Sequence, residues 1–346
     1  RQMCIRDRNK QYHAIDIMKY ISSIMVIIVH TSPLLPYSEF GNFVVINILG
    51  RFAVPFFFIS SGFFVSMKSR EDPAYFRKYI VSLIKTYMFW SILYIPCGYQ
   101  WLQNNMDIPY FLYPLALLLG FLYLGTYYHL WYMPALIFSL LVVEWYTKQH
   151  RHRPLLSIAF ILFCIGSLET YYGIVTVSPV QAVIDNYMTV FFTTRNGLFF
   201  GLFFVACGYY LSKQERWLHV EHKKLWLSFC LLILMAEAYI LNQTDTLNFN
   251  FLIMLAPCTI FLFLCLRDLS INWSIDYRRL RSYSELYYFT HAFFLVLIPM
   301  VLDVFHAEEI FEEQGWLRFF SVMLCTHVLT WLIYEWKQRT KKAIRS

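Results

Sequence analysis

Long apolar segments separated by short polar connections run along the whole chain. Each segment is close to the roughly 20 residues that a membrane-crossing helix requires. Eleven such segments lie at residues 12–31, 42–66, 79–98, 110–127, 129–147, 155–174, 190–212, 225–241, 249–266, 283–303 and 316–336. We find no sequence repeat and no low-complexity stretch. The pattern predicts an all-α integral membrane protein with one membrane domain over residues 12–336.

The composition supports this class of protein. Of the 346 residues, 58% are hydrophobic and 15% are charged, whereas soluble domains contain about 25% charged residues. These values exclude a soluble cytosolic enzyme and a disordered chain. The eight cysteines include no CxxC pair, and most lie in apolar runs. We interpret them as core residues, and we expect neither disulfides nor a metal site.

The basic residues predict the orientation of the chain in the membrane. The formal net charge is +7, and 24 of the 29 Lys and Arg residues fall into six clusters. The clusters lie at residues 1–10, 68–78, 148–153, 213–224, 267–281 and 337–345. Because Lys and Arg collect in cytoplasmic loops, we expect a plasma-membrane protein with a basic cytoplasmic leader (1–11) and a basic cytoplasmic tail (337–346). The positive charge then requires no nucleic-acid partner.

One of the eleven segments must fail to cross the membrane. Eleven full crossings would place the two termini on opposite sides. We expect the exception to be segment 110–127, which follows Pro109 and contains Pro114 and Gly120. Non-helical backbone is tolerated at membrane depth where it is buried or lines a cavity. The prediction is a bundle of about ten transmembrane helices plus one re-entrant or outer-leaflet segment.

Several charged residues cannot be assigned to the cytoplasmic clusters. A charge in the middle of a membrane costs at least about 2.5–3.5 kcal/mol, and such residues usually face an interior cavity. Five basic residues remain, and one of them, Arg318, lies at the outer end of the last span, where it can extend to water. The other four lie further inside predicted spans and are Lys19, Arg51, Lys85 and Arg195. These four residues are therefore candidates for a functional site.

The first span carries a polar stripe. Lys19 and His30 are eleven residues apart, about three helical turns, so they share one face at a separation of roughly 16 Å. Asp16 lies one turn before Lys19 and is its expected ion-pair partner. The stripe fits a catalytic imidazole linked to a charge pair, and it fits equally well a buried salt bridge with an interfacial histidine.

Further candidates come from later spans. The topology places His30, Arg51, His129 and Arg195 at a similar depth in the outer half of the membrane. Taken singly, Arg51 could bond a carbonyl freed by Pro55, and His129 could belong to an interfacial aromatic belt. Lys85 lies near a cytoplasmic end, where it could attract phosphates or extend to water.

Two further histidines and four acidic residues lie in or near the predicted spans. His291 lies nearer the middle of its span, and we interpret His327 as polar filler in the packing. The acidic residues near span ends are expected to contact water: Glu144, Glu169, Glu237 and Glu285.

The polar motifs resemble those of the membrane acyltransferase-3 family. Asp16-x-x-Lys19 followed by His30 is similar to its Arg/Lys-x10-His signature, and the segment from Arg51 to Phe64 resembles its second-span block. The segments around His129, Arg195 and His291 resemble later blocks in the same order. The resemblance covers nearly the whole chain. It is most similar to the membrane half of vancomycin-resistance-type serine racemases and to short polysaccharide O-acetyltransferases.

The resemblance implies a ten-helix bundle that transfers an acyl group, usually acetyl, from cytoplasmic acetyl-CoA to a hydroxyl acceptor. The acceptor would be a carbohydrate, a cell-envelope component or a small molecule. It implies that His30 is the catalytic base or a transient acyl carrier, with Asp16 and Lys19 in the signature. Arg51 and Arg195 would hold donor phosphates or a developing oxyanion, and His129, Lys85 and His291 would bind substrate or donor. Because position 19 is Lys, a bidentate grip on phosphate is lost there.

Another class of function fits the same composition. Intramembrane His and Arg residues in about ten spans would suit an exporter of an anionic small molecule or a lipid-linked sugar. Such transporters often contain repeated halves with interrupted helices. The order of the family motifs favours acyl transfer over transport.

Overall fold

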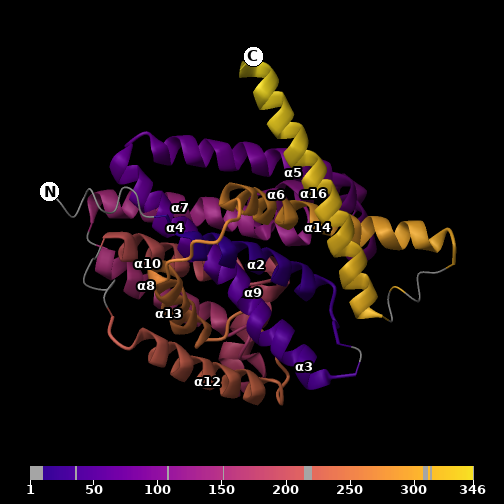
Figure 1. The fold of residues 1–346 in the computed structure, drawn as a ribbon. Coiled ribbons are helices and arrows are strands. Elements are labelled where there is room, and N and C mark those ends of the chain that lie inside the picture. Colours follow the sequence, from indigo (N-terminus) through magenta and orange to yellow (C-terminus); the bar gives the residue numbers. More distant parts are fainter. Residues whose placement is uncertain are drawn as a thin grey trace. The chain divides into compact units, whose positions relative to one another are not determined.

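The computed structural model describes residues 11–35, 37–106, 109–150, 152–213, 220–306, 311 and 314–345. Within these residues every regular element is helical, as Figure 1 shows. The predicted all-α class is therefore confirmed. The predicted leader lies outside the described residues except for Gln11. The acidic residues Glu308, Glu309, Glu312 and Glu313, between the last two apolar segments, also lie outside the described residues.

Each of the eleven predicted apolar segments corresponds to a helix. In chain order the elements are α2 (His13–His30), α3 (Glu39–Phe43), η1 (Val44–Leu49), η2 (Gly50–Phe52), α4 (Ala53–Glu71), α5 (Tyr75–Asn105), η3 (Tyr110–Leu112), α6 (Tyr113–Tyr123), η4 (Tyr128–Trp131), α7 (Tyr132–Gln149), α8 (His152–Ser167), η5 (Tyr172–Ile174), α9 (Ser178–Phe191), η6 (Gly197–Gly201), α10 (Leu202–Lys213), α12 (Lys223–Leu241), α13 (Leu255–Asp268), α14 (Tyr277–Asp303) and α16 (Gly315–Arg345).

Many of these helices have the length and composition of membrane spans. In the described part of the chain, seven helical stretches are long and apolar enough to cross a membrane. Three shorter apolar helices cover Tyr110–Tyr123, Arg153–Ser167 and Gly197–Lys213. The stretch Tyr110–Tyr123 is roughly 21 Å long, well short of the roughly 30 Å hydrocarbon core. Its length agrees with the segment that was expected not to cross, and the re-entrant path stays a prediction.

Helix α9 corrects the prediction for residues 175–189, which the sequence pattern indicated as a connection. The segment folds as the helix Ser178–Phe191, with Pro179 in its first turn. Proline fits the first turn because its fixed φ suits a helix and it needs no hydrogen-bond acceptor there. The helix ends where Phe192 adopts a φ of 63°. An amphipathic helix with Gln181 and Asp185 is too polar to resemble a span, which is why hydropathy missed it.

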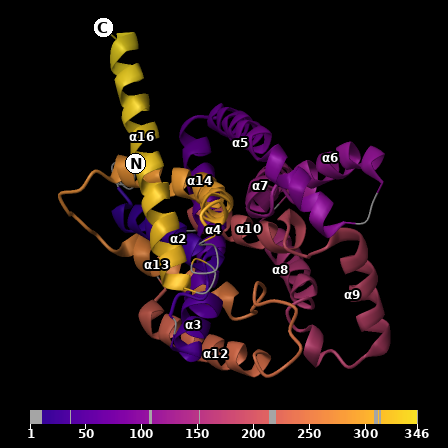
Figure 2. The same cartoon turned by 90° about the vertical axis from the view of Figure 1, so that its right-hand side faces the viewer.

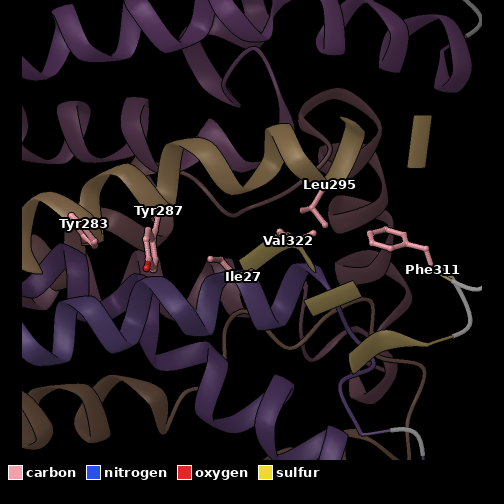
Figure 3. Close-up of a cluster of buried hydrophobic side chains, with 6 residues drawn as sticks. All are labelled: Ile27, Tyr283, Tyr287, Leu295, Phe311 and Val322. Atoms are coloured by element: carbon pink, nitrogen blue, oxygen red, sulfur yellow. The ribbon is translucent and has the colours of Figure 1, made fainter. Parts of the chain in front are cut away.

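The chain divides into two compact units, which are described separately. The first contains residues 1–46 and 261–346, and the second contains residues 47–260. In the first unit α14 packs against α2 and α16. Figure 3 shows its buried cluster, in which Tyr283, Tyr287 and Leu295 extend from α14 towards Ile27 of α2 and Val322 of α16.

In the second unit α4 and α10 form the most extensive helix pair, and they lie side by side in Figures 1 and 2. Small residues allow their backbones to approach closely. A methyl group on Gly62 would collide with the carbonyl oxygen of Val205, and one on Gly208 would collide with the carbonyl oxygen of Ile59. Four residues beyond each glycine, the Ser66 and Ser212 hydroxyls are hydrogen-bonded at 2.6 Å.

These contacts reveal a local repeat that the sequence analysis missed. Residues 55–66 match residues 201–212 with a constant offset, and both segments contain Phe-Phe, Gly and Ser at the same positions. The contacts follow this correspondence, because Val205 is the equivalent of Ile59 and Gly208 is the equivalent of Gly62. Helices α4 and α10 are thus two copies of one packing element. Four identities in twelve residues are too few to notice in so apolar a chain.

Candidate functional site

The first unit brings two predicted histidines together. His30, at the end of α2, and His291, in the middle of α14, have ring centroids 5.4 Å apart and nearly parallel planes. His291 is fully buried, and His30 is half-buried. The Nδ1 atom of His291 lies 2.9 Å from the carbonyl oxygen of Tyr287. Because a carbonyl can only accept, Nδ1 carries the proton in this contact.

The charged end of the polar stripe is fixed by α14. Asp16 is buried and forms an ion pair with Arg281 at 2.5 Å. The expected partner of Asp16 was Lys19, and Arg281 belongs to the basic cluster at residues 267–281. The hydroxyl of Ser284 donates to the carbonyl oxygen of Lys19 at 2.9 Å. These two contacts lie one helical turn apart along α2 and hold it against α14.

His327 was expected to fill space in the packing, but it belongs to a chain of hydrogen-bonded side chains. Its Nδ1 atom lies 2.5 Å from the hydroxyl of Tyr287, which is 3.2 Å from the hydroxyl of Tyr20. Figure 3 shows the Tyr287 ring extending from α14 with its hydroxyl towards α2. The carbonyl group of this same tyrosine accepts from His291. Tyr287 therefore connects the histidine pair to His327.

The second unit contains Arg51 and Arg195, which the sequence predicts to lie inside spans. Arg51 donates from Nη1 to the side-chain oxygen of Asn250 at 2.6 Å and from Nη2 to that of Asn47 at 3.0 Å. Both acceptors are uncharged. The Nε atom of Arg51 is buried and has no hydrogen-bond partner among the described residues. The charge of Arg51 is thus held in place but not neutralised by these contacts.

Arg195 is held differently. Its guanidinium lies over the ring of Trp131, 5.3 Å from the centroid, which is a cation–π distance. Its Nε atom is also buried and without a hydrogen-bond partner in the described part of the chain. Arg51 and Arg195 are close enough to repel each other, and the carboxylate of Glu169 attracts Arg195.

Glu169 is buried, and this corrects the expectation that it contacts water. Its side chain accepts from the backbone N–H of Thr194 at 2.6 Å and from the Thr194 hydroxyl at 2.6 Å. Asn248 also donates to it. Glu237 is likewise bonded, accepting from the backbone N–H groups of residues 253 and 254. Only the pairing of distant segments reveals these roles, so hydropathy gave no signal.

Irregular helices flank both arginines. The π-helix η1 ends two residues before Arg51, and the π-helix η6 begins two residues after Arg195. Asn196, which directly follows Arg195, caps η6 by accepting from the N–H groups of Leu198 and Phe199. Single π-turns often occur at functional sites, since they redirect side chains.

The remaining predicted residues have different surroundings. His129, in η4, is buried and meets the ring of Tyr94 edge-on at 4.6 Å. Lys85 is exposed on α5. The structure thus places His129, Arg51 and Arg195 in the second unit and His30, His291, Asp16 and Lys19 in the first. Among the described residues, no three His, Cys, Asp or Glu side chains are grouped as metal ligands would be.

Comparison with known proteins identifies a family that agrees with the sequence motifs. The acyltransferase domain of the acyltransferase-3 type matches residues 12–335. An amino-acid racemase of Enterococcus faecalis is 28% identical over 336 residues, covering 94% of this chain and 45% of the relative. A second amino-acid racemase of that organism is 25% identical, covering 95% and 47%.

A serine/alanine racemase of Enterococcus gallinarum is 24% identical over 253 residues, which are 71% of this chain and 36% of the relative. The chain therefore spans less than half the length of these curated relatives. No solved structure matches it.

Proposed function

We propose, because the chain belongs to the acyltransferase-3 family, that it is a membrane O-acyltransferase. It moves an acyl group, acetyl in the first instance, from cytoplasmic acyl-CoA to a hydroxyl of an extracytoplasmic acceptor. The acceptor is a carbohydrate, a cell-envelope component or a small hydroxyl compound. About ten crossings with both termini in the cytoplasm belong to the same proposal, as do the plasma membrane as location and residues 12–336 as the catalytic domain.

The stacked pair of His30 and His291 is the observation that carries the proposal. Acyl transfer from a thioester needs a group that takes the proton of the acceptor hydroxyl, and a neutral imidazole does this at neutral pH. His291 is fixed by the Tyr287 carbonyl. It therefore holds one face of the His30 ring.

The reaction balances without an external oxidant or metal. His30 takes the acceptor proton while the acceptor oxygen bonds to the acyl carbon and the carbon–sulfur bond breaks. The proton is then delivered to the departing thiolate of coenzyme A. If His30 carries the acyl group instead, its ring nitrogen bonds to the acyl carbon as the carbon–sulfur bond breaks, and the imidazole proton leaves with the thiol. The acceptor oxygen then bonds to the acyl carbon as the carbon–nitrogen bond breaks, and the acceptor proton restores the imidazole.

The other predicted residues have supporting roles in this proposal. Asp16 and Lys19 set the position of α2, through the Arg281 ion pair and the Ser284 hydrogen bond. Lys85 attracts the anionic donor near the cytoplasmic surface. Arg51, Arg195 and His129 bind substrate. The racemase activity named for the relatives is not part of the proposal, since it belongs to proteins about twice as long.

Acetyl transfer by inverted membrane vesicles tests the function. Vesicles containing the protein receive acetyl-CoA labelled in the acetyl group, and their products are examined by mass spectrometry for an added acetyl group. We expect covalent labelling of an acceptor, loss of labelling in His30→Ala, and full labelling in His150→Ala, which changes an exposed histidine. Full activity in His30→Ala, or uptake of label without a covalent product, contradicts the proposal and favours transport.

A further inference from the structure

The arginine pair lies where the two copies of the repeat begin. The ring centroids of Phe58 and Phe200 lie 6.0 Å apart near the start of the α4–α10 pair. The hydroxyls of Ser66 and Ser212 are hydrogen-bonded near its end. Contacts in this order show that α4 and α10 run in the same direction. Arg51 therefore precedes one helix, and Arg195 precedes the other, at the same end of the pair.

The two arginines concentrate positive charge at this end. Asn196 caps the helical turn that leads into α10, and Arg51 lies inside the continuous helical stretch Glu39–Glu71. The charge of this end therefore comes from the two guanidinium groups. The opposite end of the pair carries Lys68, Arg70 and Lys213. Arg51 and Lys68 are 17 residues apart, about 26 Å along a helix, which is nearly the thickness of the hydrocarbon core.

The charge of the cluster is not balanced. Glu169 is the carboxylate that acts on Arg195, and the side-chain partners of Arg51 are the uncharged Asn47 and Asn250. Among the described residues, two guanidinium charges thus face one carboxylate. Both Nε–H groups are buried and lack an acceptor among the described residues, and a buried unsatisfied charged donor is costly.

A single monovalent oxyanion would meet both requirements. It would neutralise the remaining charge, and its oxygens would accept from the two Nε–H groups in charge-assisted hydrogen bonds. We infer that Arg51 and Arg195 form a site for a monovalent oxyanion, a carboxylate or a phosphodiester, carried by the acceptor. The inference deepens the proposed acyl transfer. It rests on that proposal only in identifying the bound molecule as the acceptor.

The acceptor fits this site better than the donor. Positive residues mark the cytoplasmic side, and the arginine pair lies at the other end of α4 and α10. Coenzyme A approaches from the basic end and carries several phosphate charges, more than the single excess charge of the cluster would balance. This assignment differs from both roles that the sequence predicts for these arginines, which are to hold donor phosphates or a developing oxyanion.

Thermal unfolding of the full-length protein in lipid nanodiscs tests the site. The probes are glycerate, a hydroxyl-bearing carboxylate, and glycerophosphoglycerol, a hydroxyl-bearing phosphodiester, with uncharged glycerol as the blank and coenzyme A as the donor probe. Arg51→Lys and Arg195→Lys keep the charge but lose the Nε–H fork. Arg51→Gln and Arg195→Gln remove the charge, and Lys224→Gln removes an exposed charge as the matched control.

We expect glycerate or glycerophosphoglycerol to raise the Tm of the wild type and of Lys224→Gln by several degrees. The apparent Kd of that anion should rise at least tenfold in each Lys variant, and the Tm shift should vanish in each Gln variant. Which of the two probes acts identifies the source of the oxyanion. Coenzyme A should shift the Tm of the wild type and the Gln variants equally.

Two results overturn the inference. One is that neither anion shifts the Tm of a wild type whose unfolding is cooperative. The other is that the shift with coenzyme A disappears in the arginine variants, which assigns the pair to the donor. Both readouts are independent of acetyl transfer. The site can therefore fail while the proposed function stands, and anion binding can persist if no acyl transfer is found.

Discussion

At the scale of single residues, His291 is the group whose role the structure defines most closely. Its Nδ1–H is committed to the Tyr287 carbonyl, and its ring stacks on His30. We predict that His291→Gln, which can still donate to this carbonyl, folds but loses the stacked ring. Because a misplaced catalytic group can cost about 10²-fold in rate, kcat should fall about that much with KM for acetyl-CoA little changed.

The matched control for this prediction is His327→Gln. Its Nδ1 contact is to the hydroxyl of Tyr287 rather than to the histidine pair. It should keep more activity than His291→Gln. Equal kcat for His291→Gln and the wild type would show that the stacking does not position His30.

The ion pair between Asp16 and Arg281 predicts a measurable coupling. The Asp16 side chain is 8% exposed, and that of Arg281 is 49% exposed, so solvent screens the interaction. We expect a coupling free energy of unfolding of about 0.5–1 kcal/mol in the cycle of Asp16→Asn, Arg281→Gln and the double variant. Chemical unfolding in detergent measures it. The more exposed pair of Lys78 and Asp72, whose side chains are 70% and 49% exposed, gives the reference cycle, and its coupling should be smaller.

Asp72 also predicts a pH effect. It lies between α4 and α5, where hydrogen bonds from Lys78 and from the N–H of Ala74 lower the pKa of its carboxyl below the ordinary value. The folded state therefore favours the ionised form. Its contribution to stability is present above the ordinary pKa of about 3.9 and is lost as the pH falls through the lower folded value.

The difference in Tm between the wild type and Asp72→Asn measures this contribution. The difference should be constant from pH 7 to about pH 5 and should shrink below about pH 4. A difference that grows as the pH falls would contradict the sign.

At the scale of elements, the glycines that separate α4 from α10 predict equal effects. A Cβ on Gly62 or on Gly208 would collide with backbone, which cannot move aside as a side chain can. Each alanine substitution should destabilise the protein by about 1–3 kcal/mol, the usual cost of overpacking. The repeat predicts that the two costs agree, since each glycine occupies the equivalent position.

Gly120→Ala in α6 is the control, because its Cβ would lie 3.3 Å from the nearest atom, the carbonyl oxygen of Gly125. Thermal unfolding of the three variants measures the effects. If Gly62→Ala destabilises and Gly208→Ala does not, the two helices are not equivalent.

At the scale of the whole molecule, the helices could be predicted from the sequence, but their partners could not. Apolar length alone identified every span-like helix, and it missed α9 because an amphipathic helix has no long apolar run. The same limit applies to the site. Glu169 bonds Thr194 and Asn248 across 25 and 79 residues, and such long-range pairings leave no periodic signal in one sequence.

The placement of charges predicts the orientation of the molecule in the membrane, which its helices alone do not define. The six basic clusters predict a cytoplasmic C-terminus and an outer position for the segment that contains α9. A green fluorescent protein fused after Ser346 should fluoresce, because it folds in the cytoplasm, and an alkaline phosphatase fused there should be inactive.

The reverse pattern is expected for fusions after Thr176, immediately before α9, where the connection carries no Lys or Arg. Fusions after Lys148 provide the internal cytoplasmic control, because they follow α7 in a basic cluster. An active phosphatase at both Ser346 and Thr176 would mean an even number of crossings between them, which contradicts the five predicted spans. The segment Tyr110–Tyr123 lies before both points, so the pair of fusions at residues 99–106 and Lys148 tests its failure to cross. Opposite sidedness at those two points requires an odd number of crossings between them. α7 supplies one, so α6 then adds none.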